Sequence, residues 1–595
     1  MSLKLLIGRA GLAPLTLLFA FAFTLGPPDP AFPQQATDSV APEITTGVSD
    51  RSAVTANDFM VAVANPIAAK AGHDVLSAGG NAIDAMVAIQ MVLGLVEPQS
   101  SGLGGGAFLV YWDNEGDSLT TYDGRETAPK AATPTLFLNA DGEPLKFFDA
   151  VVGGRSVGTP GTLKLLYEVH SKHGKLPWSG LLQPAITLAD LGFEVSPRLH
   201  GMIAADAERL SVHEATRAYF LDSNGSAHPV GHVLQNPAYA ETLRQIADGG
   251  ADVFYNGPIA LGIVETVIDN DNPGVLQPED LATYQIKQRP PVCVAYRGYD
   301  VCGMGPPSSG ALTVGQILGL LEPFDLASLG PDNPESWRLI GDASRLAFAD
   351  RGRYMADSDF VPMPTEGLLD RAYLDERARL LEPGAVLTAE QVTPGTPPWD
   401  HAMLLADDDS LELPSTSHFS IADPFGNVVS MTTTIENGFG SRLMTHGFLL
   451  NNELTDFSFR THRGGVPIAN RVEPGKRPRS SMAPTIIMKD GEPFAAIGSP
   501  GGSRIIGYVA KTVIAMIDWD VEIQSAINLP HLVNRFGTYD LEKGTAAERL
   551  KEPLEQLGYK ANLRDLNSGL HGIVFGADGL TGGADPRREG VVLGQ

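Results

Sequence analysis

The chain has 595 residues, of which 43% are hydrophobic and 19% charged, a globular composition that allows one large or two to three ordinary domains. Its formal net charge of −27 at pH 7 argues against nucleic acid or an anionic membrane surface as the partner, because like charges repel. Its 65 glycines and 44 prolines predict many turns and loops.

Residues 1–25 have the pattern of a secretory signal peptide. Lys4 and Arg9 come first, an apolar run follows, and Pro27-Pro28 ends it. The triplet Ala20-Phe21-Ala22 offers a small-x-small cleavage site, although another site before about residue 37 fits as well. The alternative is an uncleaved anchor, but the run is short for a membrane span.

Residues 26–57 are rich in Pro, Thr and Ser and predict a disordered leader. We therefore expect a periplasmic or secreted protein without stable membrane insertion after signal removal. Order is expected to begin near Val61. A helix over Pro66–Ala78 would end at a Gly-Gly pair, and Asn81 can cap a second helix that runs through Leu95.

A glycine-rich turn at residues 100–106 leads into a predicted strand, Phe108–Trp112. Its glycines superficially fit a dinucleotide-binding loop. That loop must follow a strand and open a helix, whereas this one follows a helix and opens a strand. We interpret these glycines as allowing close backbone packing near a pocket.

The middle of the chain, residues 155–385, is predicted to be mostly helical, and residues 386–415 form a flexible linker rich in Pro, Thr and Asp. From residue 416 the pattern becomes β-rich. This order of elements indicates layered α and β structure rather than a parallel doubly wound sheet. The predicted helices cover Thr162–His173, Trp178–Leu191, Pro237–Ala247, Trp337–Tyr354, Ile505–Ile517 and Ile523–Asn528.

The two cysteines flank an alternating segment with an Arg297-Gly298 turn, which predicts a hairpin. Counting outward from the turn, Cys293 faces Cys302 as a non-hydrogen-bonded pair, with Cα atoms roughly 4.5 Å apart. We expect a cross-strand disulfide in an oxidising compartment. The alternative is two free thiols on one face of the sheet.

Residues 416–434 read as a strand, a Pro-Phe-Gly-Asn turn and a second β-branched strand. A proline-bearing linker ends just before this hairpin, at Ser415. If the chain were cut there, Thr416 would carry a hydroxyl and a free amine on one residue. That pair is a complete nucleophile and base.

Two later loops have residue types suited to a substrate pocket. The loop from Lys476 to Thr485 joins basic residues to Ser480 and Ser481, which suits a carboxylate; alternatively it is a solvated basic turn. The turn Gly498–Arg504 has consecutive glycines before an apolar helix, which can aim two backbone N–H groups into a cleft as an oxyanion hole. The alternative is an ordinary strand-to-helix turn.

No metal-binding or nucleotide-binding motif supports a cofactor. His170 and His173 lie near a helix end without acidic or cysteine partners, and the chain lacks the His-Glu-x-x-His, Cys-x-x-Cys and Walker patterns. We therefore expect neither a metal nor any other cofactor.

Taken together, the segments resemble the gamma-glutamyltransferase (glutathione hydrolase) family from about residue 61 almost to the C-terminus. The resemblance implies an N-terminal-nucleophile (Ntn) hydrolase, an α+β fold built as a four-layer αββα sandwich, with a mostly helical extension in the large subunit. It implies self-cleavage between Ser415 and Thr416 into a large subunit, 58–415, and a small subunit, 416–595, that stay interwoven. The matching motifs are Gly79–Asp84, Glu97–Gly106, Asp123–Pro129, Ser156–Gly161, Pro306–Gly310, Ala347–Arg351, Thr416–Ser420, Leu450–Glu453, Asp456–Ser458, Lys476–Ser481 and Gly498–Arg504.

The resemblance also implies roles for individual residues. Thr416 would attack the γ-amide of glutathione or a related gamma-glutamyl compound, and the acyl-enzyme would pass to water or to an amine acceptor. The implied roles are nucleophile for Thr416, support of the nucleophile for Thr434, oxyanion binding for Gly501 and Gly502, α-carboxylate binding for Arg125, Ser480 and Ser481, and α-ammonium binding for Glu453 and Asp456.

The chain departs from the family pattern at several positions. Glu436 replaces a common Asn and could strengthen ammonium binding or compete with the substrate carboxylate. Arg442 stands where members of the family commonly have a small residue, and Ser417 replaces the family's second Thr. The segment 460–474, which forms a lid in some members, is short. A more open pocket could accept peptides or larger acyl groups.

Two other functions remain open. One keeps the fold: an acylase of the glutaryl-amide or cephalosporin type, or a poly-gamma-glutamate depolymerase, if Glu436 and Arg442 reshape the ammonium site. The other is an inactive exported binding or structural homologue, which would not cleave itself.

Overall fold

The computed structural model describes residues 43, 45, 47–382, 384–401, 403–408 and 410–595. The predicted signal peptide, 1–25, lies outside the described residues. Two seven-stranded sheets form the centre of the molecule. The first has the order β1 (Val54–Ala56), β22 (Gly579–Ala584), β21 (His571–Gly576), β17 (Glu492–Gly498), β16 (Thr485–Lys489), β9 (Tyr299–Gly303) and β8 (Val292–Tyr296).

The second sheet contains the predicted hairpin at its centre. Its order is β23 (Val591–Gly594), β2 (Met60–Val63), β10 (Ser417–Ala422), β11 (Val428–Thr434), β3 (Gly106–Asp113), β4 (Ser118–Gly124) and β7 (Lys287–Arg289). The two sheets pack face to face, with Met60, Ile573 and Val592 in one apolar cluster between them. Val110, Ile486 and Ala496 form part of a second cluster.

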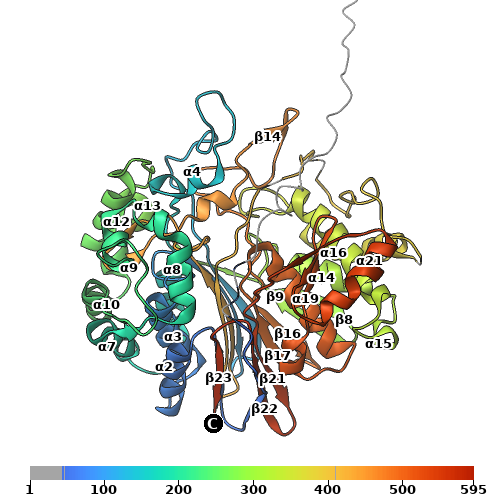
Figure 1. Ribbon diagram of the computed structural model, residues 1–595, viewed down its shortest axis with the longest axis horizontal. Helices are drawn as coiled ribbons and strands as arrows, with labels where there is room; N and C mark the ends of the chain where they lie inside the picture. Colours follow the sequence, from blue (N-terminus) through green and yellow to red (C-terminus); the bar gives the residue numbers. More distant parts are fainter. Residues whose placement is uncertain (1–42, 44, 46, 383, 402, 409) are drawn as a thin grey trace, which may run out of the picture.

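Helices cover the outer face of each sheet, so the molecule has four layers (Figure 1). On the second sheet lie α2 (Pro66–Ser77), α3 (Ala82–Val96) and α5 (Thr162–His173). The first sheet is covered by α14 (Gly310–Leu321), α19 (Ile505–Ile517) and α20 (Ile523–Asn528), with α16 (Pro334–Tyr354) packed on α14. The predicted αββα sandwich is confirmed.

The helical extension is also confirmed, because helices are the main regular elements between β4 and β7. Its helices are α4 (Phe147–Val151), α5, α6 (Trp178–Leu181), α7 (Gln183–Leu191), α8 (Pro197–Leu210), α9 (Glu214–Phe220), α10 (Pro237–Gly249), α11 (Asp252–Tyr255), α12 (Pro258–Ile268) and α13 (Pro278–Ala282). The remaining helices are α15 (Leu326–Leu329), α17 (Thr365–Leu368), α18 (Arg371–Ala378) and α21 (Lys551–Leu557).

Smaller elements complete the chain. Short strand pairs are β5 (Phe193–Glu194) with β6 (Val233–Leu234), β12 (Met444–Thr445) with β13 (Phe448–Leu449), and β14 (His462–Arg463) with β15 (Val466–Pro467). A three-stranded sheet contains β18 (Leu532–Asn534), β19 (Thr538–Glu542) and β20 (Lys560–Arg564). The 3₁₀ turns are Gly154–Ser156, Arg379–Leu381, Glu453–Asp456, Gly502–Arg504 and Ala546–Leu550.

Most predicted helices match, but the one expected over Trp178–Leu191 is wrong. The structure has two helices, α6 and α7, which meet at Leu182. Pro184 lies in the first turn of α7, where its missing N–H is harmless, whereas inside one continuous helix it would remove a hydrogen bond. The prediction therefore ignored a helix-breaking residue.

The leader prediction is wrong at its C-terminal end. Val54–Ala56 form β1, which pairs antiparallel with β22, so order begins before Val61. Glu43 is also buried, between two arginines. Both contacts are made with residues near the C-terminus or in distant helices, which local composition cannot reveal.

The predicted disulfide is confirmed. Cys293 and Cys302 face each other on β8 and β9 and form a bond, with Cα atoms 4.0 Å apart.

Segments from before and after Thr416 alternate within both sheets. In the second sheet β10 lies between β2 and β11, and β11 lies beside β3. In the first sheet β22 pairs with β1, and β16 pairs with β9. The two halves of the chain are therefore joined by hydrogen-bond ladders in both sheets.

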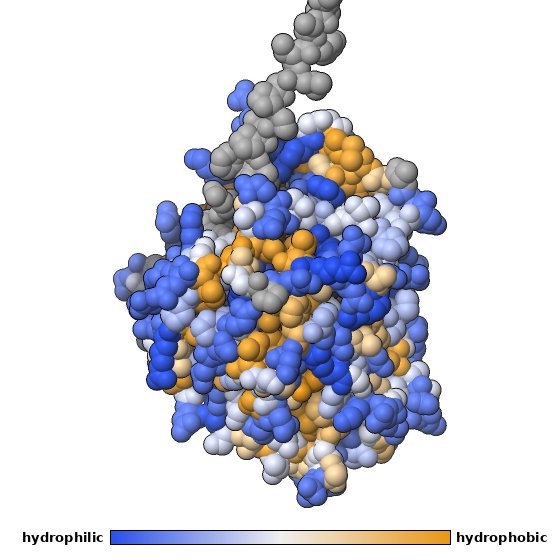
Figure 2. Space-filling model, turned by 90° about the vertical axis from the view of Figure 1, so that its right-hand side faces the viewer, coloured by the Kyte–Doolittle hydropathy of each residue, from blue (hydrophilic) through white to orange (hydrophobic). Residues whose placement is uncertain are grey.

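The face shown in Figure 2 mixes polar side chains with scattered apolar ones. Among the described residues, no helix has the length and apolar character needed to span a bilayer.

Candidate active site

The β10–β11 hairpin brings Thr416 and Thr434 together. Ser417 pairs with Thr433, so the same register places Thr434 opposite Thr416, at the open end of the hairpin. The turn at the other end is closed by Asp423, whose carboxylate accepts the Phe425 N–H at 2.8 Å. The pairing of the two threonines thus follows from the turn position and the two-residue period of the strands.

Both threonine hydroxyls contact the carbonyl of the bond that is predicted to break. The Thr416 hydroxyl lies 2.5 Å from the Ser415 carbonyl oxygen. The Thr434 hydroxyl donates to the same oxygen at 3.0 Å. All three residues are buried. A nucleophilic oxygen therefore lies beside a carbonyl group that a second hydroxyl polarises.

We expect Thr434→Val to slow cleavage of the bond between Ser415 and Thr416 by about 10²–10³-fold, as loss of one oxyanion donor does elsewhere. The substitution removes the hydroxyl of Thr434 and keeps the shape and the β propensity of the side chain. The measurement is the rate at which the 416–595 fragment appears on denaturing gels.

The matched control is Thr433→Val on the same strand. Thr433 is buried, and within the described residues its hydroxyl has no hydrogen-bond partner. Its replacement should leave the cleavage rate within about twofold. Equal rates for the Thr434 and Thr433 variants would contradict a role for the Thr434 hydroxyl.

Two glycine-rich turns approach this bond closely. Gly501 and Gly502 have φ angles of +135° and +58°, a backbone that side chains disfavour, and they connect β17 to α19 as predicted. Gly502 lines the pocket together with Thr416. At the other turn, a Cβ on Gly105 would lie 2.0 Å from the Thr434 carbonyl oxygen, so the predicted close packing is confirmed.

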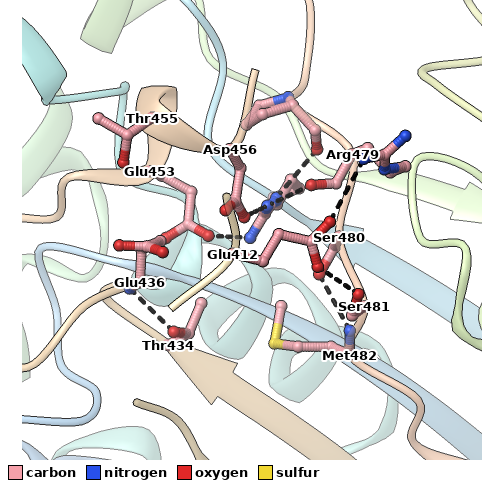
Figure 3. A network of polar contacts seen from close by, with 12 residues as sticks. Glu412, Thr434, Glu436, Glu453, Thr455, Asp456, Arg479, Ser480, Ser481 and Met482 are labelled. Carbon is pink, nitrogen blue, oxygen red and sulfur yellow. Dashed lines mark hydrogen bonds and ion pairs between the residues drawn. The ribbon is translucent and has the colours of Figure 1, made fainter. Parts of the chain in front are cut away.

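Beside Thr416 lies a small pocket. Figure 3 shows Glu436, Glu453 and Asp456 gathered on one side of this site and Ser480 to Met482 on the other. The lining residues are Arg125, Glu412, Leu413, Thr416, Thr434, Glu436, Glu453, Asp456, Ser480, Ser481, Met482, Gly502 and Ile505. Nearly all the predicted site residues are therefore brought to one place.

Arg125 is in direct contact with the carboxylates of the site. Its guanidinium forms ion pairs with Glu453 and, at 2.5 Å, with Asp456. It also donates to the carbonyl oxygen of Arg479 at 2.9 Å. From their predicted roles, Arg125 would form a cationic end of the site, and Glu453 and Asp456 an anionic end. This separation is wrong for the uncleaved chain, because a buried guanidinium needs counter-ions.

Glu436 adds a third carboxylate to this cluster. It accepts hydrogen bonds from Asn452 and from the Leu413 N–H, the latter at 3.3 Å. Burial, with help from the neighbouring Asp456 and Glu453, raises the pKa of Glu436 well above its usual range. Burial likewise raises the pKa values of Glu453 and Asp456. Arg125 pairs with two of these three carboxyl groups, so a cation bound beside them would favour their ionised forms.

The segment before the cleavage site occupies part of the pocket. The Glu412 carboxylate contacts the Arg351 guanidinium and the Ser481 hydroxyl, and Arg479 lies 3.4 Å from it. Burial opposes its ionisation, but Arg351 and Arg479 lower the pKa of Glu412 to about 2. The predicted affinity of the Ser480–Ser481 loop for a carboxylate is therefore met, by a carboxylate of the same chain.

The linker prediction needs correction for the same reason. Residues 386–415 contain no helix or strand among those described, but their last part is anchored rather than flexible. Asp408 pairs with Arg479 at 2.9 Å, and the Ser415 hydroxyl donates to the Gln99 carbonyl oxygen at 2.8 Å. Buried charge, invisible in the linker's composition, holds it in place.

Arg442 and Lys476 lie outside the pocket lining. Arg442 pairs with Asp206 of α8 at 2.8 Å, and Lys476 donates to the Ala469 carbonyl oxygen at 2.7 Å. Arg442 therefore supports the loop that follows Glu436, and the idea that its guanidinium reshapes the ammonium site is not supported.

Sequence reasoning missed the ion pair between Arg351 and the pocket residue Glu412. Arg351 ends the quoted Ala347–Arg351 motif, and Glu412 lies four residues before Thr416 in an acidic stretch. These positions in the sequence are the signals that could have pointed to the two residues, but neither position predicts that the Arg351 and Glu412 side chains meet.

Three comparisons place this site among known proteins. The family model described as Gamma-glutamyltranspeptidase matches residues 68–595. The glutathione hydrolase proenzyme of Bacillus subtilis (strain 168) is 38% identical over 90% of this chain and 91% of its own length. That of Escherichia coli (strain K12) is 36% identical over 92% and 94%. The crystal structure of cephalosporin acylase from Bacillus halodurans is similar with a TM-score of 0.81 and 28% identity, over 92% and 97%.

Proposed function

Because this chain belongs to the gamma-glutamyltranspeptidase family, we propose that it cleaves itself before Thr416 and then acts as a gamma-glutamyl hydrolase and transferase. The observation that carries the proposal is the pair of hydroxyls on one carbonyl: Thr416 at 2.5 Å and Thr434 at 3.0 Å from the Ser415 oxygen. The products are a large subunit that ends at Ser415 and a small subunit, 416–595.

Self-cleavage proceeds in two steps. The Thr416 Oγ attacks the Ser415 carbonyl carbon while the Thr434 hydroxyl stabilises the negative charge on its oxygen. The C–N bond then breaks, the proton passes to the nitrogen, and the amide becomes an ester. Water hydrolyses this ester, which leaves a carboxylate on Ser415 and a free α-amine on Thr416.

The new amine supplies the base for turnover. An N-terminal amine has an ordinary pKa near 8, so a substantial fraction is neutral near pH 7 to 8. It accepts the proton of its own hydroxyl as the oxygen attacks the γ-carbonyl of the donor. The N–H groups of Gly501 and Gly502 hold the oxyanion, and the amine of the donor leaves with that proton as the acyl-threonine forms. The acyl group then passes to water or to an amine acceptor, which frees Thr416.

The pocket suits a zwitterionic gamma-glutamyl group, such as that of glutathione. The substrate α-ammonium binds among Glu436, Glu453 and Asp456, which line the pocket. Its α-carboxylate binds Arg125, whose planar fork matches a carboxylate, and takes the place of Glu412 at Ser481. The ammonium of the substrate thereby favours the ionised forms of these carboxyl groups.

A second candidate is an acylase for glutaryl amides, which the similarity to the cephalosporin acylase structure raises. A glutaryl group has no ammonium. It would leave the carboxyl groups of Glu436, Glu453 and Asp456 without an ammonium to bind, and so would forgo their charge-assisted hydrogen bonds. The composition of the pocket therefore favours gamma-glutamyl donors.

We expect the processed enzyme to prefer gamma-glutamyl p-nitroanilide over glutaryl p-nitroanilide by about 10²-fold or more in kcat/KM, since hydrogen bonds to a charged group such as the ammonium contribute about 1.5–3 kcal/mol each. The measurement is the release of p-nitroaniline from each. Glu436→Gln should narrow this preference and leave self-cleavage intact. A preference for the glutaryl compound would make the acylase the better assignment.

We further propose that the protein acts outside the cytoplasm, in the periplasm or as a secreted enzyme. The signal-like residues 1–25 and the disulfide between Cys293 and Cys302 support this. Intact mass and N-terminal sequencing of both fragments test the export signal and the division at residue 416 together. An inactive homologue would remain a single chain.

A further inference from the structure

A buried ion network outside the pocket lining joins four residues that are far apart in the sequence. Glu43 forms ion pairs with Arg198, at 3.0 Å, and with Arg588. Arg198 also pairs with Glu97, at 3.3 Å. Each of the four side chains is at most 3% exposed. Two guanidinium groups and two carboxylates thus balance in a region closed to water.

The network comes from elements that flank the central hairpin. Glu97 follows the last residue of α3, and Arg198 is the second residue of α8. Arg588 lies between β22 and β23, near the C-terminus. Glu43 belongs to the segment for which the sequence predicted disorder. It is the one member of the network that contacts both arginines.

Two consecutive residues after the scissile bond contact this network. Arg588 Nη1 donates to the Thr416 carbonyl oxygen at 3.4 Å. The Ser417 hydroxyl donates to Glu97 at 3.3 Å. The backbone of the nucleophile is therefore held on the side where the network lies.

We propose that Glu43 is a positioning residue for Thr416: it holds Arg588 against the Thr416 carbonyl and so fixes the backbone from which Thr416 attacks. The proposal rests on self-cleavage and turnover by Thr416. Without the Glu43 charge, Arg588 loses its ion pair and is left near Arg198, and like charges push the two guanidinium groups apart. A displacement of about 1 Å at a reacting group is enough to cost roughly 10²-fold in rate.

The charge state of the network agrees with this role. Burial opposes ionisation of Glu43, yet Arg198 and Arg588 outweigh it and lower the pKa of this carboxyl. Glu43 is therefore charged at neutral pH. It remains in the protein only if signal removal cuts the chain before residue 43, as the predicted cleavage region does.

The test uses the full-length chain with Glu43→Gln, which keeps the shape and removes the charge. We expect self-cleavage to slow by about 10- to 100-fold. Once processed, this variant should show kcat lowered by a similar factor and KM unchanged, because Glu43 lies outside the pocket lining. Glu43→Asp should recover most of the cleavage rate. If Glu43→Gln fails to fold, Arg588→Lys takes its place. It keeps the positive charge but loses the planar guanidinium, and it should slow self-cleavage as Glu43→Gln is expected to do.

The matched control is Asp342→Asn, which removes a carboxylate from a buried ion pair with Arg345 in α16. It should lower the melting temperature but keep the cleavage rate within about twofold. Three results would overturn the proposal: an unchanged rate for Glu43→Gln, an equal defect in the control, or a change confined to KM. If the wild-type chain does not cleave at all, the proposed function fails instead.

Discussion

Thr416→Ala is expected to leave the chain intact and to abolish turnover. Without the hydroxyl, nothing attacks the Ser415 carbonyl, so the bond persists and no α-amine is released. Removal of the nucleophile in a well-studied protease lowers kcat by about 10⁶-fold, and we expect a loss of at least about 10⁴-fold here. Denaturing gels and p-nitroaniline release measure the two effects.

Thr416→Ser provides the contrast, because it keeps the hydroxyl and loses only a methyl group. This variant should cleave itself and turn over substrate, both more slowly than the wild-type protein. A melting temperature within a few degrees of wild type would show that the Ala variant is folded. The mechanism is wrong if purified Thr416→Ala appears as two fragments, or if an intact wild-type chain releases p-nitroaniline at the full rate.

Arg125→Ala is expected to damage substrate use and to spare self-cleavage. Truncating one partner of a buried, hydrogen-bonded charge pair costs about 2–5 kcal/mol. That corresponds to a loss of roughly 30- to 3,000-fold in kcat/KM. Self-cleavage should stay within about threefold, because Arg125 contacts Glu453, Asp456 and two carbonyl oxygens of the 476–481 loop rather than the scissile bond.

Arg442→Ala is the matched control, since Arg442 is equally buried and ion-paired but lies outside the pocket lining. It should lower stability by a similar amount and leave kcat/KM within a fewfold of wild type. Arg125→Lys separates charge from geometry and should recover only part of the loss, because an ammonium lacks the planar fork. Equal losses of cleavage and turnover in Arg125→Ala would show that Arg125 is structural.

Much of this architecture could be predicted from local patterns. Asn81 caps α3 through a capping box, and the helix begins where the sequence indicated. The alternation and turn of residues 416–434 predicted the hairpin, and its register explains why Thr434 meets Thr416. The spacing of the two cysteines predicted their bond. In each case the partners are close in sequence.

The missed features all depend on buried charges that meet across long stretches of chain. Glu43 and Arg588 are 545 residues apart, and Arg351 and Glu412 are 61 apart. The periodicity of a helix or a strand relates only residues that are close in sequence, so it does not link such residues. In addition, a charged side chain is normally expected at the surface. The pairing of Arg125 with Glu453 and Asp456 was missed for a related reason: the roles were assigned for a substrate-bound pocket, whereas the uncleaved chain must neutralise its own charges.

The alternation of early and late strands within both sheets makes denaturation a one-way process for the mature enzyme. The precursor folds as one molecule, with β2 and β10 tethered by the same backbone. After scission that tether is gone, and recovery from the unfolded state becomes a second-order reaction between two polypeptides. Each then lacks its partner strands in the ladders β1–β22, β9–β16, β2–β10, β2–β23 and β3–β11. Renaturation yield should therefore rise with protein concentration for the processed form but not for the uncleaved variant.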